Sequence, residues 1–291
     1  MDDGIKIRVC YWINKKNNCR GTILLQQGHN EFIEKYYETI QEFMDRDYSV
    51  ISFDWRGQGM SDHQIDDIHK AFIKDFKRHD LDLKYILEEI IEENFPKPLI
   101  GIGHSMGGCL MLSAFHDHEK KFDLGILSAP MLGFKNEKFL KVASSLMNFF
   151  KKDTDYLLGS RPNMGIETPF ELNDLTTDKK RYERIQKLVK MKPSIRLWGV
   201  TNSFAKSVNR RFKVIRNDQW ISKIKTKILI FNSVNDRVVD GDKTAKLAKK
   251  IVNCKTINLI GMEHEIFMEK DEFREKFWKN FDMFVEENIN F

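Results

Sequence analysis

The stretch Gly103-His104-Ser105-Met106-Gly107 decides how the rest of this sequence is interpreted. It follows the apolar run Pro98–Ile102, which predicts a strand, and it precedes Gly108–Phe115, whose pattern predicts a helix. A G-x-S-x-G pattern between a strand and a helix is typical of a sharp turn that carries a nucleophilic serine. Glycines on both sides remove the Cβ atoms that would clash in such a turn. We therefore predict that Ser105 is a nucleophile; the alternative is an ordinary strand-to-helix turn.

The composition indicates one large globular unit. The 291 residues are 41% hydrophobic and include 22 phenylalanines, enough for a single core with an inserted lobe. No apolar run approaches the roughly 18 residues of a membrane span, and the first residues lack the layout of a secretion signal. The four cysteines have no C-x-x-C spacing, which favours reduced thiols over a disulfide or zinc framework. We therefore expect a cytoplasmic protein.

The charge is unevenly distributed along the chain. The formal net charge is +5, yet residues 135–216 alone hold 19 Lys and Arg against 8 Asp and Glu. The rest of the chain is therefore net acidic. A basic middle segment suggests a surface that meets something anionic, for example a membrane. The alternative is a solvated, lysine-rich surface without a partner.

Strand and helix patterns alternate over most of the chain. The expected strands are Ile5 to Trp12, Gly21 to Gln26, Tyr48 to Phe53, Pro98 to Ile102, Leu124 to Leu127, Lys227 to Phe231 and Thr256 to Ile260. The expected helices are Glu31 to Asp45, Lys70 to Asn94, Gly108 to Phe115, Lys243 to Val252 and Glu269 to Glu287. This alternation predicts the α/β class, with a mostly parallel central sheet and helices on both of its faces.

The alternation stops between Pro130 and Lys227, where no strand is expected. We therefore predict a core formed by residues 1–132 and 217–291, with residues 133–216 inserted as a helical cap. Such a cap would lie over the carboxyl edge of the sheet, where ligands bind in open α/β sheets. An amphipathic piece at Phe139–Phe150 is expected to form the core of this lobe, with a lipid-facing role as the alternative.

A serine nucleophile needs a base, and His264 is the candidate. Only His116, His118 and His264 follow Ser105, and the first two lie at the far end of the helix that begins there. His264 follows the strand expected at Thr256 to Ile260, so it lies in a loop at a strand's carboxyl end. The alternative is an exposed loop histidine without a role in catalysis.

The base needs an acid that orients it, and Asp236 is the candidate. It follows the strand expected at Lys227 to Phe231, in agreement with the order serine, acid, histidine that this turn implies. The alternative is that Asp236 is only a turn residue. Asp240 and Asp242 lie farther along and are expected to cap the next helix.

A tetrahedral intermediate carries an oxyanion that two backbone N–H groups must bind. Met106 follows the nucleophile and is expected to supply one of them. His29, in the loop Gln26–Asn30, is expected to supply the other, with Gly28 permitting a tight turn. His29 has no ligand-like neighbours in sequence, so a metal role is not expected. We expect no metal and no cofactor, because this chemistry needs neither.

The segment Asp54–Ser61 has glycine spacing that could suggest a phosphate-binding loop. It lacks the Lys-Ser/Thr ending of a P-loop and the G-x-G-x-x-G spacing of a dinucleotide site. We therefore expect a structural role in the turn after the strand at Tyr48 to Phe53.

Taken in order, four motifs resemble those of the α/β-hydrolases of the monoacylglycerol lipase and bacterial lysophospholipase group. They are Asp54-x-Arg56-Gly57-x-Gly59-x-Ser61, Gly103-His104-Ser105-Met106-Gly107-Gly108, Asn235-Asp236-Arg237 and Gly261-x-x-His264-Glu265. Further segments resemble the lysophospholipase branch: Thr168-Pro169-Phe170, Leu175-Thr176, Arg181-Tyr182, Pro193-Ser194-Ile195-Arg196, Asp236-Arg237-Val238-Val239-Asp240 and His264-Glu265-Ile266. Where many members have His-Gly in the oxyanion loop, this chain has Gln27-Gly28, which leaves open how the loop is braced.

The resemblance implies a serine carboxylic-ester hydrolase whose cap binds a single-chain lipid, a lysophospholipid or a monoacylglycerol. The expected partners are this lipid ester and, through the basic cap, an anionic membrane surface at the inner face of the membrane; nucleic acid is not expected. A short-chain esterase, a thioesterase and an aminopeptidase are alternatives on the same residues. A binding protein without catalysis is the alternative from another class, although such a protein gains nothing from a strained serine.

Overall fold

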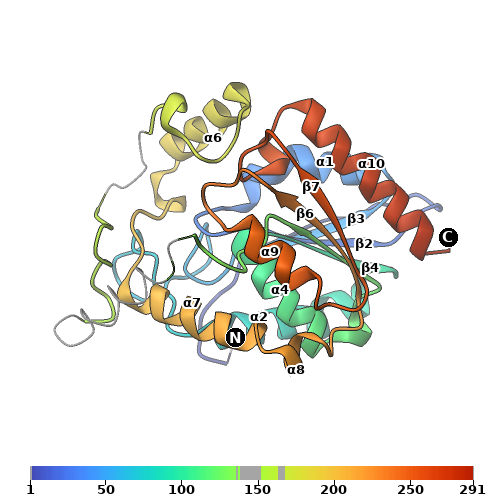
Figure 1. Cartoon of the computed structure of the whole chain (residues 1–291), viewed down its shortest axis with the longest axis horizontal. Helices are drawn as coiled ribbons and strands as arrows, with labels where there is room; N and C mark the ends of the chain where they lie inside the picture. Colours follow the sequence, from blue (N-terminus) through green and yellow to red (C-terminus); the bar gives the residue numbers. More distant parts are fainter. Residues whose placement is uncertain (1, 136, 138–151, 163–167, 291) are drawn as a thin grey trace.

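The computed structural model describes residues 2–135, 137, 152–162 and 168–290. Seven strands form one sheet in the order β1-β3-β2-β4-β5-β6-β7 (Figure 1). The strands are β1 (Val9–Trp12), β2 (Thr22–Gln26), β3 (Ser49–Phe53), β4 (Leu99–His104), β5 (Leu124–Ser128), β6 (Lys227–Ser233) and β7 (Cys254–Leu259). Only β1 pairs antiparallel, and every other pair is parallel. The predicted α/β fold with a mostly parallel sheet is therefore confirmed.

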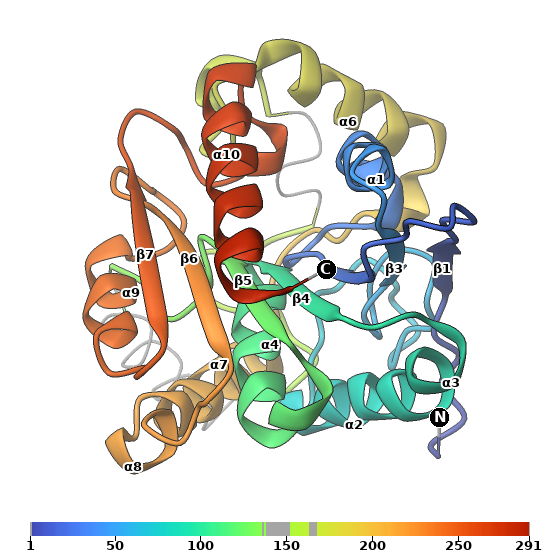
Figure 2. The same ribbon diagram turned by 90° about the vertical axis from the view of Figure 1, so that its right-hand side faces the viewer.

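Helices cover both faces of this sheet. They are α1 (Tyr37–Asp45), α2 (Phe76–Ile86), α3 (Glu92–Asn94), α4 (Ser105–Asp117), α6 (Lys179–Met191), α7 (Asn202–Ile215), α8 (Asp218–Ile221), α9 (Gly241–Ala248) and α10 (Asp271–Asn288). Short 3-10 segments are η1 (Ile33–Tyr36), η3 (Glu119–Lys121), η4 (Phe170–Leu172), η5 (Pro193–Ile195) and η6 (Ile266–Met268), and η2 (Leu87–Ile91) is a π-helical turn. Figure 2 shows α1 and α10 on one side of the sheet and α2 and α4 on the other.

Alternation along the strands divides the apolar core into two clusters. In β2, Leu24 belongs to the cluster on the α2 and α4 side, whereas Ile23 and Leu25 belong to the cluster on the α1 and α10 side. Successive side chains of a strand point to opposite faces, so a strand covered on both faces is mostly apolar. This explains why β2 to β5 are buried throughout their length.

Two of the expected helices begin later in the structure than the sequence pattern suggested. The region Glu31 to Asp45 starts as a loop and the η1 turn before α1. The region Lys70 to Asn94 becomes helical only at Phe76, because Asp75 adopts an extended conformation and its carboxylate accepts a hydrogen bond from the Lys77 N–H. The residues before Asp75 pair with another segment instead, since Ala71 and Val200 form a β-bridge.

The inserted segment contributes α6 and α7, and its described residues contain no named strand. Figure 1 shows α6 standing away from the sheet, whereas α7 lies close to α2. The apolar face of α7, with Phe204, Val208 and Phe212, joins the main core cluster. The amphipathic stretch Phe139–Phe150 lies outside the described residues, and the boundaries at 133 and 216 stay a prediction.

The described helices include none that combines the length and the hydropathy needed to cross a membrane.

The turn after β3 is held by a buried ion pair. The Arg56 guanidinium, fully buried, donates to both carboxylate oxygens of Asp82 at 2.5 and 2.6 Å. Removing one partner of a buried ion pair destabilises the folded state, because the remaining charge stays buried without compensation. The expected structural role of the Asp54–Ser61 segment agrees with this arrangement.

We predict that Asp82→Ala lowers the free energy of unfolding by about 3 kcal/mol, because the buried Arg56 guanidinium loses two hydrogen bonds and, among the described residues, keeps only its contact with Asp3 at 2.7 Å. Urea unfolding followed by circular dichroism measures this difference. As a control, Glu93→Ala on the exposed surface of α3 should change it by less than about 0.5 kcal/mol. Equal stabilities for the Asp82 and Glu93 variants would contradict the assignment.

Candidate active site

Ser105 lies at the turn between β4 and α4 in a strained backbone conformation. Its φ is +50°, which only a few non-glycine residues adopt. A Cβ at Gly103 would lie 2.7 Å from the Gly107 carbonyl oxygen, and a Cβ at Gly107 would lie 2.4 Å from that of Gln27. The glycines therefore allow three backbone segments to approach more closely than any side chain would permit.

His264 links Ser105 to Asp236 through two hydrogen bonds. Its Nε2 lies 2.9 Å from Ser105 Oγ, and its Nδ1 lies 2.7 Å from Asp236 Oδ2. Asp236 follows β6 and His264 follows β7, so adjacent parallel strands bring both loops to the same edge of the sheet. All three side chains are buried. The structure thus brings together the three residues that the sequence pointed to.

The environment of this trio favours the charge distribution that general-base chemistry needs. Burial opposes the charged form of His264, but the hydrogen bond and charge of Asp236 outweigh it, and the pKa of His264 is raised. Burial also opposes ionisation of Asp236, yet the contact with His264 lowers its pKa overall. The other Asp236 oxygen accepts hydrogen bonds from the Val238 and Val239 N–H groups at 2.7 and 2.9 Å. These bonds fix the carboxylate that faces the imidazole.

Asp240 has a different role. Its carboxylate accepts a hydrogen bond from the Lys243 N–H at 3.1 Å and so caps the N-terminus of α9. This is the capping role expected for it from the sequence.

The two residues predicted to bind an oxyanion lie on either side of Ser105. Met106 is the second residue of α4. His29 follows Gly28, where a Cβ would lie 2.9 Å from Ser105 Cβ, so the loop between β2 and η1 touches the nucleophile. Burial lowers the pKa of His29 to about 4, and the imidazole ring packs against Phe204 with centroids 4.6 Å apart. Its side chain is therefore neutral.

The β2–η1 loop is braced by the turn that follows β3. The Gln58 amide donates to the Gly28 carbonyl oxygen at 3.0 Å and accepts from the Asn30 N–H at 2.9 Å. The Trp55 indole N–H donates to the Gln27 carbonyl oxygen at 2.9 Å. This loop has Gln27-Gly28 where many members of the group have His-Gly, and the bonds show how it is nevertheless braced. The support comes from the Asp54–Ser61 motif.

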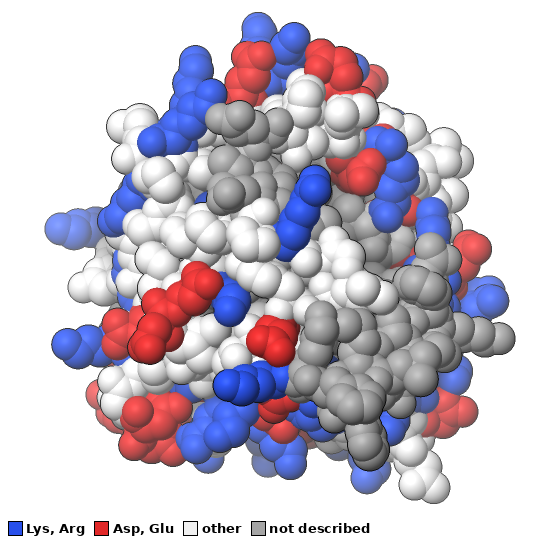
Figure 3. Space-filling model, turned by 90° about the vertical axis from the view of Figure 1, so that its left-hand side faces the viewer, with Lys and Arg blue, Asp and Glu red and all other residues white. Residues whose placement is uncertain are grey.

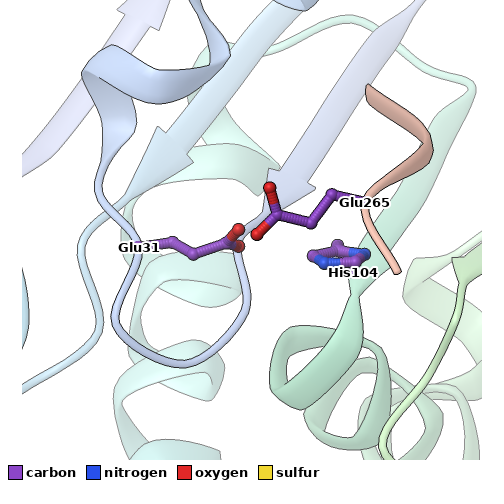
Figure 4. A group of neighbouring side chains, drawn as sticks. All are labelled: Glu31, His104 and Glu265. Atoms are coloured by element: carbon purple, nitrogen blue, oxygen red, sulfur yellow. The ribbon is translucent and has the colours of Figure 1, made fainter. Parts of the chain in front are cut away.

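Three buried side chains beside the trio have the composition of a metal site. Ligand atoms of Glu31, His104 and Glu265 all lie within 4.8 Å of one another (Figure 4). The Lys35 ammonium lies 2.5 Å from Glu31 Oε1 and 2.6 Å from Glu265 Oε1. The Lys35 ammonium therefore lies between the two carboxylates and balances one of their two charges; a metal cation beside it would meet like charge, so this set does not fit a metal ion.

Sequence reasoning missed these charged residues. Glu31 and Lys35 have the i,i+4 spacing of a helical ion pair, and Glu265 follows the candidate base. Those signals were present, but surface ion pairs have the same spacing. Only the tertiary structure shows that all three are buried.

Two cavities meet at Ser105. One, of about 240 Å³, is lined by the charged side chains of Glu31, Lys35 and Glu265 together with apolar residues, and we refer to it as the polar cavity. The other, of about 370 Å³, has mainly apolar walls that include Met131, Phe134, Leu157, Phe204 and Val208. Both also reach His29. The site is thus a two-armed cleft with the nucleophile at the junction.

Comparison with known proteins agrees with this geometry. The family described as serine aminopeptidase, S33, matches residues 17–271. Probable lysophospholipase L2 of Haemophilus influenzae is 25% identical over 97% of this chain and 88% of its own length. Monoglyceride lipase of Saccharomyces cerevisiae is 25% identical over 91% of this chain and 84% of its own.

The fold of a solved relative is also similar. The crystal structure of a soluble variant of the Saccharomyces cerevisiae monoglyceride lipase, in complex with a substrate analog, superposes with a TM-score of 0.76. It is 20% identical and covers 99% of this chain and 94% of that one. A thermostable carboxyl esterase from Bacillus coagulans gives the same TM-score at 20% identity, covering 98% and 94%. The chain belongs to the serine aminopeptidase S33 family and is an α/β-hydrolase enzyme.

Proposed function

We propose that this enzyme hydrolyses carboxylic esters of single-chain lipids, lysophospholipids or monoacylglycerols. The observation that carries the proposal is the continuous hydrogen-bonded path from Asp236 through His264 to Ser105, buried at the junction of two cavities. Relatives named lysophospholipase and monoglyceride lipase support the choice of substrate class.

In the proposed reaction, Ser105 Oγ attacks the ester carbonyl carbon while His264 Nε2 takes its proton. Asp236 holds the imidazole tautomer and stabilises the imidazolium. The N–H groups of Met106 and His29 bind the oxyanion, and collapse of the intermediate releases the alcohol, to which His264 returns the proton. Water then attacks the acyl-enzyme with the same base, releasing the fatty acid and restoring the Ser105 hydroxyl.

The apolar cavity suits the acyl chain. Its walls include Met131, Leu157 and Phe204, and each buried CH₂ contributes roughly 0.8 kcal/mol to binding. The polar cavity then takes the alcohol part of the ester. Residues 133–216, of which α6 and α7 are described, act in this proposal as a cap, since α6 and α7 residues line the site beside core residues.

An aminopeptidase is a second candidate because of the family description. Such an enzyme needs an acidic group for the ammonium of its substrate. Glu31 and Glu265 lie in the polar cavity, but both already pair with Lys35. The ammonium of a peptide substrate would meet the like charge of Lys35 there, so the arrangement favours an ester substrate over a peptide.

A contact of the cap with an anionic membrane is also part of the proposal. Much of the basic excess is neutralised: Arg211 is buried against Asp80, and Arg181 contacts Glu38. Figure 3 shows Lys and Arg interspersed with Asp and Glu on the face it presents. Lys180, Lys187 and Lys190, three of the four exposed lysines of α6, accompany the 82% exposed Met191. This helix is therefore the best candidate for the contact, at the inner face of the membrane.

We predict that Ser105→Ala lowers kcat on a monoacylglycerol, a lysophospholipid and a p-nitrophenyl ester by on the order of 10⁴, with the fold intact. The same panel should contain an aminoacyl p-nitroanilide, on which the wild-type enzyme should be far slower. Undiminished ester hydrolysis by the variant would overturn the function, and faster anilide hydrolysis would favour the peptidase.

Within the same panel, Asp236→Asn and Asp240→Asn are a matched pair. Asp236→Asn should be severely impaired, because an amide stabilises the wrong tautomer of His264. Asp240→Asn should retain activity, since asparagine also caps helices. A larger loss at Asp240 would reassign the acid.

The rate should depend on pH through His264. Only neutral imidazole accepts the Ser105 proton, and the raised pKa keeps His264 charged to a higher pH than histidine's ordinary 6.5. We therefore expect kcat/KM for a soluble ester to rise with pH through one ionisation whose midpoint lies above 6.5. A profile that is flat from about pH 5 to 9 would rule out histidine as base.

Vesicle binding tests the membrane contact. Lys180, Lys187 and Lys190 should each contribute roughly 1 kcal/mol of attraction to anionic lipid. We expect co-sedimentation with vesicles of phosphatidylglycerol at about 50 mM salt, release at about 500 mM, and no binding to phosphatidylcholine vesicles. Changing all three lysines to Glu should abolish binding without slowing hydrolysis of a soluble ester.

The control variant changes three exposed lysines elsewhere to Glu: Lys246 and Lys249 near the end of α9, and Lys279 on α10. Its net charge equals that of the α6 variant, so the control should still bind anionic vesicles if α6 makes the contact. Equal loss in both variants would mean that only net charge matters.

A further inference from the structure

A line of charged contacts joins the two loops that meet at Ser105. Glu31 Oε2 accepts a hydrogen bond from the Gly28 N–H, and Glu31 Oε1 lies 2.5 Å from Lys35 Nζ. The same ammonium donates to Glu265 Oε1 at 2.6 Å. Glu265 is bonded through the backbone to His264. One ammonium thus connects the loop of the candidate base to the loop of the candidate oxyanion donor.

This connection is enclosed by protein. Lys35, Glu31 and Glu265 are 5%, 3% and 6% exposed, so water screens their charges little. The Tyr36 hydroxyl donates to Glu31 Oε2 at 2.7 Å, which fixes that carboxylate further. Buried ion pairs often add little net stability compared with apolar residues, so stability alone does not account for three buried charges here.

The geometry suggests what the charges do. Gly28 touches Ser105 and precedes His29, and His264 precedes Glu265. Attack on an ester requires the base and the oxyanion donor to be aligned with Ser105 within about 0.5 Å. The two loops come from opposite ends of the chain, and Lys35 contacts an acidic residue on each.

We propose that Lys35, held between Glu31 and Glu265, is a positioning residue for ester hydrolysis that aligns the His264 loop with the β2–η1 loop across Ser105. The inference rests on the proposed function. Lys35 itself does not transfer a proton or form a bond. Its role is to keep the base and the oxyanion donor in register during both chemical steps.

The primary test is Glu265→Met, which removes the contact at the His264 loop and leaves Lys35 paired with Glu31, so no unpaired charge is buried. We expect kcat for a p-nitrophenyl ester to fall by on the order of 10- to 10²-fold, with KM within about twofold. Such an ester has no charged head group for Lys35 to contact. The rate is compared on the high-pH plateau, where His264 is neutral with or without the neighbouring charge.

Two further variants keep the test decisive. Lys35→Met combined with Glu265→Met removes the connection and leaves one carboxylate, that of Glu31, which still accepts from the Gly28 N–H and the Tyr36 hydroxyl; this variant should lose a similar factor in kcat. Lys35→Arg retains the charge and the donors, so its kcat should stay within about threefold of wild type. The low-field proton NMR signal of the His264–Asp236 hydrogen bond should shift or broaden in the first two variants and not in the third.

The matched control is Arg211→Met, which breaks another buried ion pair: Arg211 of α7 contacts Asp80 of α2 and donates to Ser113 Oγ, about two turns along α4 from Ser105. It should lower the melting temperature while leaving kcat of the folded enzyme unchanged. Wild-type kcat in folded Glu265→Met or in the double variant, with Ser105→Ala inactive, overturns the role of Lys35. A raised KM with unchanged kcat also overturns it. Activity in Ser105→Ala would instead overturn the proposed function itself.

Discussion

The structure depends on one close approach of backbone to backbone. At the start of α4, Gly107 lies so near the Gln27 carbonyl oxygen that a Cβ would be 2.4 Å from it. This contact lets β4 turn abruptly into α4 and holds Ser105 at a positive φ. It also brings the β2–η1 loop against the nucleophile. The strain is sustained because β4 is buried at the centre of the sheet, where neighbouring strands fix it on both sides.

Parallel strands then determine where the other groups lie. β6 and β7 are adjacent and end at the same edge as β4, so the loops that follow them deliver Asp236 and His264 toward Ser105. Hydrogen bonding explains the direction of the pKa shifts. Burial works against charge on both partners, but a donor and an acceptor 2.7 Å apart stabilise the ionised pair more than burial destabilises it.

Both arms of the cleft combine core residues with residues of the inserted segment. Glu31 and Glu265 of the core and Tyr182 of α6 line the polar arm. Met131 of the core and Phe204 of α7 line the apolar arm. Because α7 packs its apolar face into the main core, its position is tied to that of the sheet. A change in the inserted segment can therefore alter substrate preference while leaving the hydrogen-bonded trio as it is.

The sequence alone predicted the parallel sheet, the turn at Ser105 and the trio, because strand periodicity and glycine spacing act over short distances. It placed the starts of α1 and α2 too early; for α2, local apolar patterns do not reveal that Ala71, before the helix, pairs with Val200. Burial of Glu31, Lys35 and Glu265 depends on segments 230 residues apart in sequence meeting in space. Only the tertiary structure decides such contacts, because the energy of a charge depends on what surrounds it and not on its neighbours along the chain.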